Sequence, residues 1–184
     1  MKKWLCMLVC CLSVYVQAQV WTLKEKEPAA PGTWWCFRNT VTLDEQPRSL
    51  ELRLAADTKY WLWVNDELQV SEGGLKRGPN PLDTYCDVIT SLPALRAGEN
   101  TVALLVWYFG KDGFSHRNSS TAGISFSLSC NGKEVEPDAK WRGKKHPAYY
   151  VPQGEQPNYR LAESNIGFDA VKDIPFMSPE YNDK

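Results

Sequence analysis

The stretch Val106 to His116, VWYFGKDGFSH, holds the residue types with the most chemical potential in this chain. Three consecutive aromatic residues run into a Gly-Lys-Asp-Gly turn, which leads out through Phe-Ser-His. An aromatic ring can stack on the apolar face of a sugar, and a few planar polar groups can bind its hydroxyls. The composition is that of a sugar-binding loop, and the candidate contacts are Tyr108, Asp112, Phe114, His116 and Arg117.

Alternation along an extended chain limits which of these aromatic rings is available. Trp107 and Phe109 point to one side and Tyr108 to the other. We expect Trp107 and Phe109 to pack inside and Tyr108 to lie on the outer face. For His116 with Arg117, a sugar contact, a contact with a neighbouring domain and an ordinary surface position all remain open.

A second candidate site is the segment EGGLKRGPNPLD, Glu72 to Asp83, which is too rich in glycine and proline for regular structure. Its candidate contacts are Lys76, Arg77 and Asn80, and the alternative is a solvated loop tip whose prolines restrict the backbone. Trp34 and its neighbour Trp35 are either a stacking platform or a cover over the end of the domain. We expect the cover.

Catalysis and metal binding have less support in the sequence. Hydrolysis of a glycosidic bond needs two carboxylates about 5 to 9.5 Å apart, whereas the acidic residues fall mostly in turns (Asp66, Asp83 and Asp112) or on the polar face of a strand (Glu51). The sequence leaves a pair such as Asp83 with Asp112 open, but we name no catalytic residue. We also expect no metal and no cofactor, because the chain has no C-x-x-C motif and no dense acidic loop.

The first 18 residues are typical of a secretory signal peptide. Lys2 and Lys3 precede an apolar run from Trp4 to Val16, which leads into the small-residue ending at Ala18, and the run is shorter than the ~18 residues of a membrane span. We therefore expect a periplasmic or extracellular protein with no membrane span. Cys36, Cys86 and Cys130 then remain, and their pairing stays open. A net charge of −1 without a basic cluster argues against nucleic acid as a partner.

Short runs of alternating apolar and polar residues predict the fold. They are separated by turn signals and show no helical period; clear examples are FRNTVTL (37–43), SLELRLA (49–55) and ISFSLSC (124–130). KYWLWVN (59–65) is apolar on both faces, as a central strand of a sandwich would be, and it precedes the short strand ELQVS (67–71). We predict an all-β protein, an antiparallel β-sandwich of the jelly-roll, galactose-binding-like type. Its parts are an N-terminal arm (19–32), the sandwich (33–142) and an irregular tail (143–184).

Four segments carry a resemblance to a known family: ADTKYWLWVNDE (56–67), GLKRGPNPLDTYCDV (74–88), LRAGENTVALLVWYFGKDGFSH (95–116), and HPAY with PNYRLAESNIGFDA (146–170). They resemble the N-terminal β-sandwich of bacterial α-L-rhamnosidase-type glycoside hydrolases over roughly Pro31 to Asp173. A looser similarity links the chain to the galactose-binding-like jelly rolls of β-galactosidases. This chain departs from the pattern of those jelly rolls at two places. It has Asp66 where they usually have glycine, and Ile89 with Thr90 where they usually have threonine.

The resemblance implies an accessory role rather than catalysis. In that family the acid and base carboxylates belong to a separate α/α-toroid domain, so no catalytic residue is transferred to this chain. The expected function is a non-catalytic, carbohydrate-associated module whose tail leads toward a missing domain. Its partner would be a rhamnose- or galactose-containing glycan or a catalytic domain, on which the loop with Lys76 and Arg77 would pack. The alternatives are a stand-alone carbohydrate-binding protein and a small glycoside hydrolase.

Overall fold

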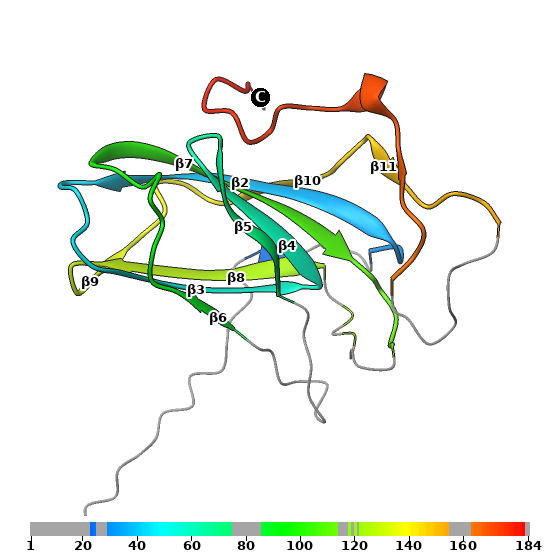
Figure 1. Cartoon of the computed structure of the whole chain (residues 1–184), viewed down its shortest axis with the longest axis horizontal. Coiled ribbons are helices and arrows are strands. Elements are labelled where there is room, and N and C mark those ends of the chain that lie inside the picture. The colour runs from blue at the N-terminus through cyan, green and yellow to red at the C-terminus, as the bar shows by residue number, and fades with distance from the viewer. Residues whose placement is uncertain are drawn as a thin grey trace, which may run out of the picture.

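Two antiparallel sheets face each other in the computed structural model, which describes residues 23–24, 29–74, 86–113, 118, 120, 122–154 and 163–182. Sheet 1 has the order β1-β8-β3-β6, with β9 paired to β8, and its strands are β1 (Leu23–Lys24), β3 (Leu50–Asp57), β6 (Asp87–Ile89), β8 (Gly123–Cys130) and β9 (Lys133–Val135). Sheet 2 has the order β10-β2-β7-β4-β5, and its strands are β2 (Thr33–Leu43), β4 (Lys59–Val64), β5 (Glu67–Gly74), β7 (Gly98–Tyr108) and β10 (Arg142–Lys145). The predicted all-β antiparallel sandwich is confirmed (Figure 1).

The main core lies between the two sheets. It forms because apolar and polar residues alternate along most strands, which places the apolar side chains on the inward face. Sheet 1 contributes Leu52, Leu54 and Leu128, and sheet 2 contributes such residues as Val102 and Leu104; all are at most 2% exposed. Strand β7 is apolar on both faces, however, and this is the pattern of a strand that is covered on both sides. A further layer must therefore lie on the outer face of sheet 2.

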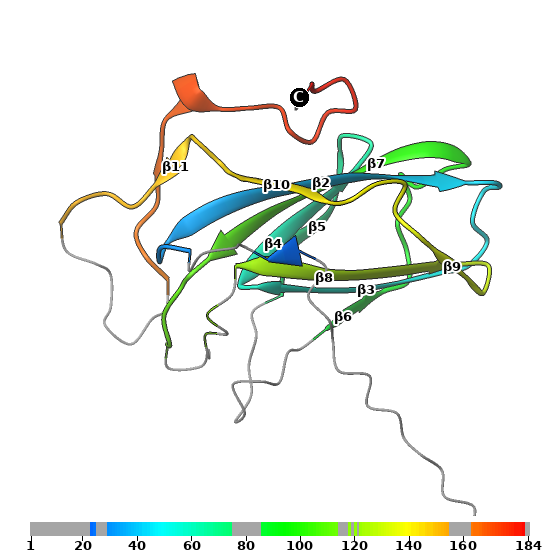
Figure 2. The ribbon, with the colours of Figure 1, turned by 180° about the vertical axis from the view of Figure 1, so that it is seen from behind.

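That layer is the C-terminal strap, residues 163–182, which crosses the outer face of sheet 2 (Figures 1 and 2). The strap enters through the ribbon of β11 (Tyr149–Tyr150) and β12 (Gly167–Phe168), continues through a 3-10 turn (Ala170–Lys172), and buries Phe176 to 2% exposure. A second cluster of buried side chains joins it to sheet 2: Trp34, Cys36, Ala103, Leu105, Trp107, Phe109 and Phe176. The protein thus has three layers, of which the strap is the thinnest.

Two strands of the sandwich lie in segments expected to flank it. The limit between sandwich and tail at residue 142 falls inside β10, which pairs with β2 from Arg142 to Lys145, so the start of the tail is an edge strand of the sandwich. The N-terminal arm also contributes a strand, since β1 pairs with β8. A continuation of the tail toward a further domain stays a prediction. The predicted signal peptide lies outside the described residues.

A hairpin turn at Asn65 and Asp66 joins β4 to β5, which pair on either side of it. Both residues have positive φ, 52° and 69°, as a two-residue hairpin turn of the primed type requires. Among the described residues, no helix has the length and apolar character needed to cross a membrane.

Candidate functional site

The aromatic residues of VWYFGKDGFSH lie on the opposite sides from those predicted. Trp107 and Phe109 are buried, 6% and 1% exposed, but on the outer face of sheet 2, beneath the strap. Tyr108 does not lie on an outer face: it is 3% exposed, on the side of β7 that carries Val106 into the main core. Burial, together with the nearby Asp57, raises the pKa of Tyr108. It is therefore a packed side chain rather than an exposed sugar platform.

Two further predicted contacts are described: Asp112 lies at the surface, where its role stays a prediction, and Trp34 is buried. Asp112 is exposed and accepts a hydrogen bond of 2.9 Å from the backbone N–H of Asn118, which closes the turn. Trp34 is 4% exposed and stacks on Tyr149, Trp107 and Trp61 with centroid distances of 4.2, 4.8 and 5.4 Å. It neither offers a stacking platform nor covers the end of the sandwich, because the chain itself covers it.

The remaining candidates lie outside the described residues. They are Phe114, His116 and Arg117 after the turn, and Lys76, Arg77, Asn80 and Asp83 in the glycine- and proline-rich segment. Their roles stay predictions.

Polar contacts at three places hold the strap on sheet 2. At its start, the ammonium of Lys59 lies 3.9 Å from the carboxylate of Glu163. In the middle, Nε2 of the buried His146 lies 3.5 Å from Asp173. At its end, the guanidinium of Arg38 donates hydrogen bonds to the backbone carbonyls of Phe176, Ser178 and Pro179.

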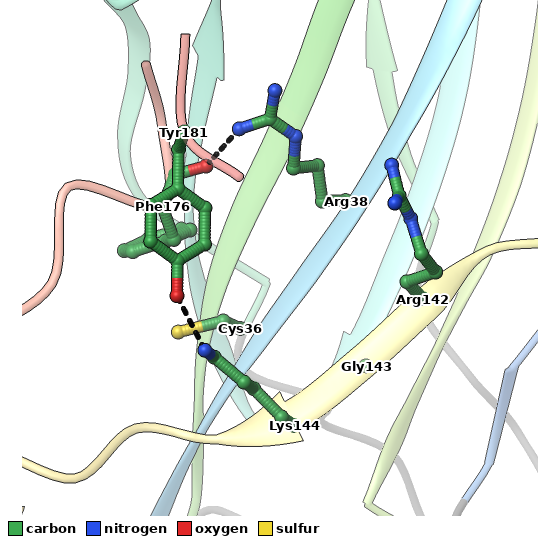
Figure 3. Close-up of a pocket in the computed structure, with 7 residues that line it drawn as sticks. All are labelled: Cys36, Arg38, Arg142, Gly143, Lys144, Phe176 and Tyr181. Carbon is green, nitrogen blue, oxygen red and sulfur yellow. Dashed lines mark hydrogen bonds between the residues drawn. The ribbon is translucent and has the colours of Figure 1, made fainter. Parts of the chain in front are cut away.

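A pocket of about 240 Å³ opens where the end of the strap meets β2 and β10 (Figure 3). Its lining residues are Cys36, Arg38, Arg142, Gly143, Lys144, Phe176 and Tyr181. The pairing of β10 with β2 places Arg142 opposite Arg38 and Lys144 opposite Cys36. Lys144 also donates a hydrogen bond to the hydroxyl of Tyr181. Three cations and two aromatic rings thus surround one opening.

Cys36 at the back of the pocket is poorly suited to nucleophilic chemistry. It is 4% exposed, and burial raises the pKa of its thiol well above the ordinary value, although the nearby Lys144 acts in the opposite direction. The thiolate is the reactive form of cysteine. The pocket is therefore suited to binding rather than to covalent catalysis.

Two carboxylates approach each other at the start of the strap, but a cation links them. Glu72 and Glu163 lie 4.0 and 3.9 Å from the same ammonium, that of Lys59. A glycosidic bond would have to occupy the space between an acid and a base, where this site holds Lys59. The arrangement is an ion-pair network that ties β5 and the strap to β4. Within the part of the chain that the structure describes, no three His, Cys, Asp or Glu side chains are grouped to hold a metal ion.

Sequence reasoning missed the residues of the pocket. A signal for them exists: in RGKK, residues 142–145, alternation places Arg142 and Lys144 on one face of a strand. Arg38 likewise falls on the polar face of FRNTVTL, together with Thr40 and Thr42. The register between the two strands could not be read from either segment alone.

Comparison with known proteins finds a similar fold in solved structures of rhamnosidases. No protein-family model matches the chain, and no curated protein matches it. Among solved structures, a GH78 family rhamnosidase of Bacillus sp. GL1 matches with a TM-score of 0.65 and 25% sequence identity, over 86% of this chain and 16% of that chain. An α-L-rhamnosidase from Dictyoglumus thermophilum matches with a TM-score of 0.50 and 16% identity, over 82% of this chain and 17% of that chain.

A weaker likeness, with a TM-score of 0.48 and 16% identity over 90% of this chain and 40% of that chain, links it to a lectin from Pleurotus ostreatus in complex with GalNAc. The chain spans less than a fifth of the length of the two rhamnosidases. The resemblance indicated by the sequence motifs is confirmed: over most of its length this chain is similar to one β-sandwich domain of a much longer α-L-rhamnosidase.

Proposed function

We propose that this chain is a non-catalytic, carbohydrate-associated β-sandwich module that serves a glycoside hydrolase of the α-L-rhamnosidase type. One observation carries the proposal: the match to the Bacillus rhamnosidase takes up 86% of this chain but 16% of the enzyme. A domain that fills so small a share of an enzyme usually assists binding or assembly. Fold alone does not imply function, so the site has to support this interpretation.

The arrangement of the carboxylates supports an accessory role. Glu72 and Glu163 share the ammonium of Lys59, which neutralises charge where an acid and base pair would act. The strap also covers Trp34 and Trp107, which in an uncovered sheet would form a broad stacking surface. The pocket beside Arg38 has polar and aromatic lining residues that could bind a small ligand.

Exposed apolar side chains near the β11–β12 ribbon support contact with a partner domain. Tyr150 is 53% exposed, Phe168 47%, Ile166 47% and Val171 96%. Apolar patches that remain exposed on a folded domain often mark interaction sites. A catalytic domain docked on the ribbon would cover them, as an accessory module requires.

Two measurements on the purified chain test the proposal. The first is incubation of the protein at high concentration with an aryl α-L-rhamnoside, for which we expect no release of the aryl group. Turnover that is lost in both Glu72→Gln and Glu163→Gln would overturn the non-catalytic assignment and favour a small hydrolase. Turnover that survives both substitutions would also overturn it and would locate the active site elsewhere in the chain.

The second measurement is calorimetric titration with rhamnose, galactose and oligosaccharides that contain them. Heat of binding for any of them supports the association with carbohydrate. Flat titrations for all of them would exclude an autonomous lectin for neutral sugars and leave the partner domain as the contact that defines the module.

A further inference from the structure

We propose that the outer face of strand β4 is a stacking site for the neutral sugar rings of a glycan. Trp61 and Trp63 lie under the rings. Lys59, together with Glu72 of β5, binds their hydroxyl groups. The inference rests on the proposed function, because it names the surface and the class of carbohydrate that the module binds.

Two tryptophans of β4 stay partly exposed beside the strap. Trp61 and Trp63 alternate with buried residues of the main core, so both rings lie on the outer face of sheet 2. They pack against the second cluster but are only partly buried, unlike Trp34 and Trp107 beneath the strap. Two residues of a strand span about 6.6 Å, so neighbouring rings of one glycan can each lie over one indole. Leu68 of β5, paired with Trp63 and 50% exposed, extends the apolar surface to the edge of the sheet.

Both indole rings retain surface on which a sugar can stack. Trp61 stacks on Trp34 with a centroid distance of 5.4 Å and an interplanar angle of 29°. Among the described residues, no second ring stacks on Trp61. Trp63 meets Phe176 edge to face, with centroids 5.7 Å apart. An indole has two faces, so surface remains for the apolar C–H face of a sugar ring.

Lys59 lies two residues from Trp61 on the same face of β4, at the centre of a polar group. Its ammonium is 4.0 Å from the carboxylate of Glu72 and 3.9 Å from that of Glu163. Both distances exceed the ~3.2 Å limit of a hydrogen bond. The ammonium donors and the carboxylate oxygens can therefore still bind hydroxyl groups. The ring of Trp107, with its centre 5.8 Å from the ammonium, helps to hold Lys59 in place.

A β-bulge aims Glu72 at this polar group. The register of β4 against β5 shifts between Tyr60 and Leu62, and two residues of β5, Ser71 and Glu72, lie opposite the single residue between them. Glu72 has φ of 56°, in the left-handed region that is uncommon for residues other than glycine. Bulges are frequent next to functional sites, where they redirect a side chain. The Glu72 side chain is 62% exposed and is open to a ligand.

The charge of the polar group favours a neutral sugar. Glu72 and Glu163 carry two negative charges against the one positive charge of Lys59, which leaves a net charge of −1. An anionic ligand would be repelled, whereas sugar hydroxyls can donate hydrogen bonds to the carboxylates. Stacking surface and hydroxyl-binding groups thus lie side by side on one strand, which is the combination that a sugar ring requires.

The test is an NMR titration of the full chain with isotope-labelled tryptophan. The probes are methyl α-L-rhamnoside, methyl β-D-galactoside and mannitol, an open-chain polyol that has hydroxyls but no ring. We expect at least one glycoside to shift the indole N–H signals of Trp61 and Trp63, which Trp61→Phe and Trp63→Phe assign. The signal of Trp141, 8% exposed in the main core, should stay unchanged. Mannitol should shift none of the three signals.

Substitutions then measure the contribution of each group to the affinity. Trp61→Phe keeps a smaller ring and should weaken glycoside binding by about threefold, and Trp61→Ala by about tenfold or more. Glu72→Gln removes the charge that strengthens its hydrogen bonds and should weaken binding by at least about threefold. Because Glu72 is exposed, this variant carries the test even if Trp61→Ala fails to fold.

Two variants are matched controls, and both should bind the glycoside within about twofold of the parent. Glu67→Gln removes the same charge from the same strand, but Glu67 pairs with Val64 and lies on the other face of the sheet. Tyr150→Ala removes an exposed aromatic ring from the β11–β12 ribbon instead of from β4.

Each alternative result would overturn the inference. Glycoside binding that leaves the signals of Trp61 and Trp63 unchanged would place the sugar elsewhere on the protein. Weakening by Glu67→Gln or Tyr150→Ala as large as that by Glu72→Gln would remove the local role of β4. Binding of neither glycoside, or equal shifts with mannitol, would reject the site. The rhamnoside assay decides the non-catalytic assignment independently, so the proposed function fails or stands separately.

Discussion

Nη1 of Arg38 lies 2.9 Å from the carbonyl oxygen of Phe176, which is 138 residues further along the chain. The same guanidinium reaches the carbonyls of Ser178 and Pro179. One buried side chain of β2 thus holds the end of the strap on sheet 2, while the ring of Phe176 fills the space above the tryptophans. The contact makes the strap an integral layer of the fold and forms one wall of the pocket.

Replacing Arg38 with glutamine should release the end of the strap. Hydrogen bonds to charged groups contribute about 1.5 to 3 kcal/mol, so we expect a loss of about 2 to 3 kcal/mol in the free energy of unfolding, measured by urea denaturation. Trypsin should also cleave faster after the exposed Lys172. Arg48→Gln is the control, since that side chain is exposed and far from the strap; its effect should stay within about 0.5 kcal/mol. Equal effects of the two substitutions would contradict the anchoring role.

In the hairpin turn between β4 and β5, two substitutions by glycine should change the stability of the protein in opposite directions. Asp66 has φ of 69°, a left-handed conformation that glycine adopts without strain. Asp66→Gly should stabilise the protein by about 0.5 kcal/mol, because relief of left-handed strain exceeds the added freedom of the unfolded chain.

Asn65→Gly relieves the same kind of strain but removes three hydrogen bonds. The amide of Asn65 donates to the carbonyl of Ala94 and to the side chain of Asn100, and it accepts from the N–H of Thr101. We expect this variant to lose about 2 to 3 kcal/mol in thermal or chemical unfolding. A gain in stability for both variants would show that backbone strain alone governs the turn.

The sandwich could be predicted because the sequence of each strand by itself shows which of its two faces is apolar. In ISFSLSC and SLELRLA, every second side chain is apolar, and this pattern fixes both the strand and the face that turns inward. Strand β7 has no such asymmetry: Leu104 and Leu105 are both buried, on opposite faces. The sides of Trp107 and Tyr108 could not be assigned without knowing that a second layer covers the sheet.

The strap was not predicted as a layer because its main anchor leaves no trace in the sequence. Arg38 binds backbone carbonyls, which every residue possesses, so the identities of Ser178 and Pro179 give no sign of the contact. The pocket depends in turn on the register of β10 against β2, which is set by tertiary pairing. Charge and residue type could be read from the sequence, but the juxtaposition of Arg38 with Arg142 could not.

Thiol labelling should distinguish the three described cysteines. Cys36 and Cys130 are buried, and burial raises the pKa of both thiols, whereas Cys86 is partly exposed. With iodoacetamide near neutral pH, mass spectrometry should find Cys86 modified first and the other two modified only after unfolding. In Arg38→Gln, Cys36 should become reactive while Cys130, in sheet 1, remains protected. Rapid modification of Cys36 in the parent protein would contradict the closed position of the strap.

Protonation of His146 should loosen the middle of the strap. His146 is 2% exposed; its Nδ1 accepts a hydrogen bond from the N–H of Ala148, and its Nε2 lies 3.5 Å from Asp173. Burial lowers the pKa of His146 below 6.5, and the positive charge of Lys144 adds to this effect. The attraction of Asp173 opposes it without prevailing. The folded protein therefore favours the neutral imidazole.

The sign of the pH dependence follows from this. The unfolded chain has the ordinary histidine pKa of about 6.5 and binds the proton more readily than the folded protein does. The stability contributed by neutral His146 is complete above that value and is lost as the pH falls from 6.5 through the lowered pKa of the folded state. Urea denaturation should thus show a larger loss of stability between pH 7.5 and 5 in the parent than in His146→Gln, since glutamine can still accept from Ala148.

Asp173→Asn sharpens the test, because it removes the carboxylate that favours the charged imidazole. Its loss of stability over the same pH range should exceed that of the parent, whereas Asp169→Asn, on the same strap, provides the control for removal of a carboxylate. The carboxylate of Asp169 pairs with Lys172 at 2.9 Å, at the exposed 3-10 turn. If the parent, His146→Gln and Asp173→Asn all lost stability in parallel, the buried histidine would not be the group that senses pH.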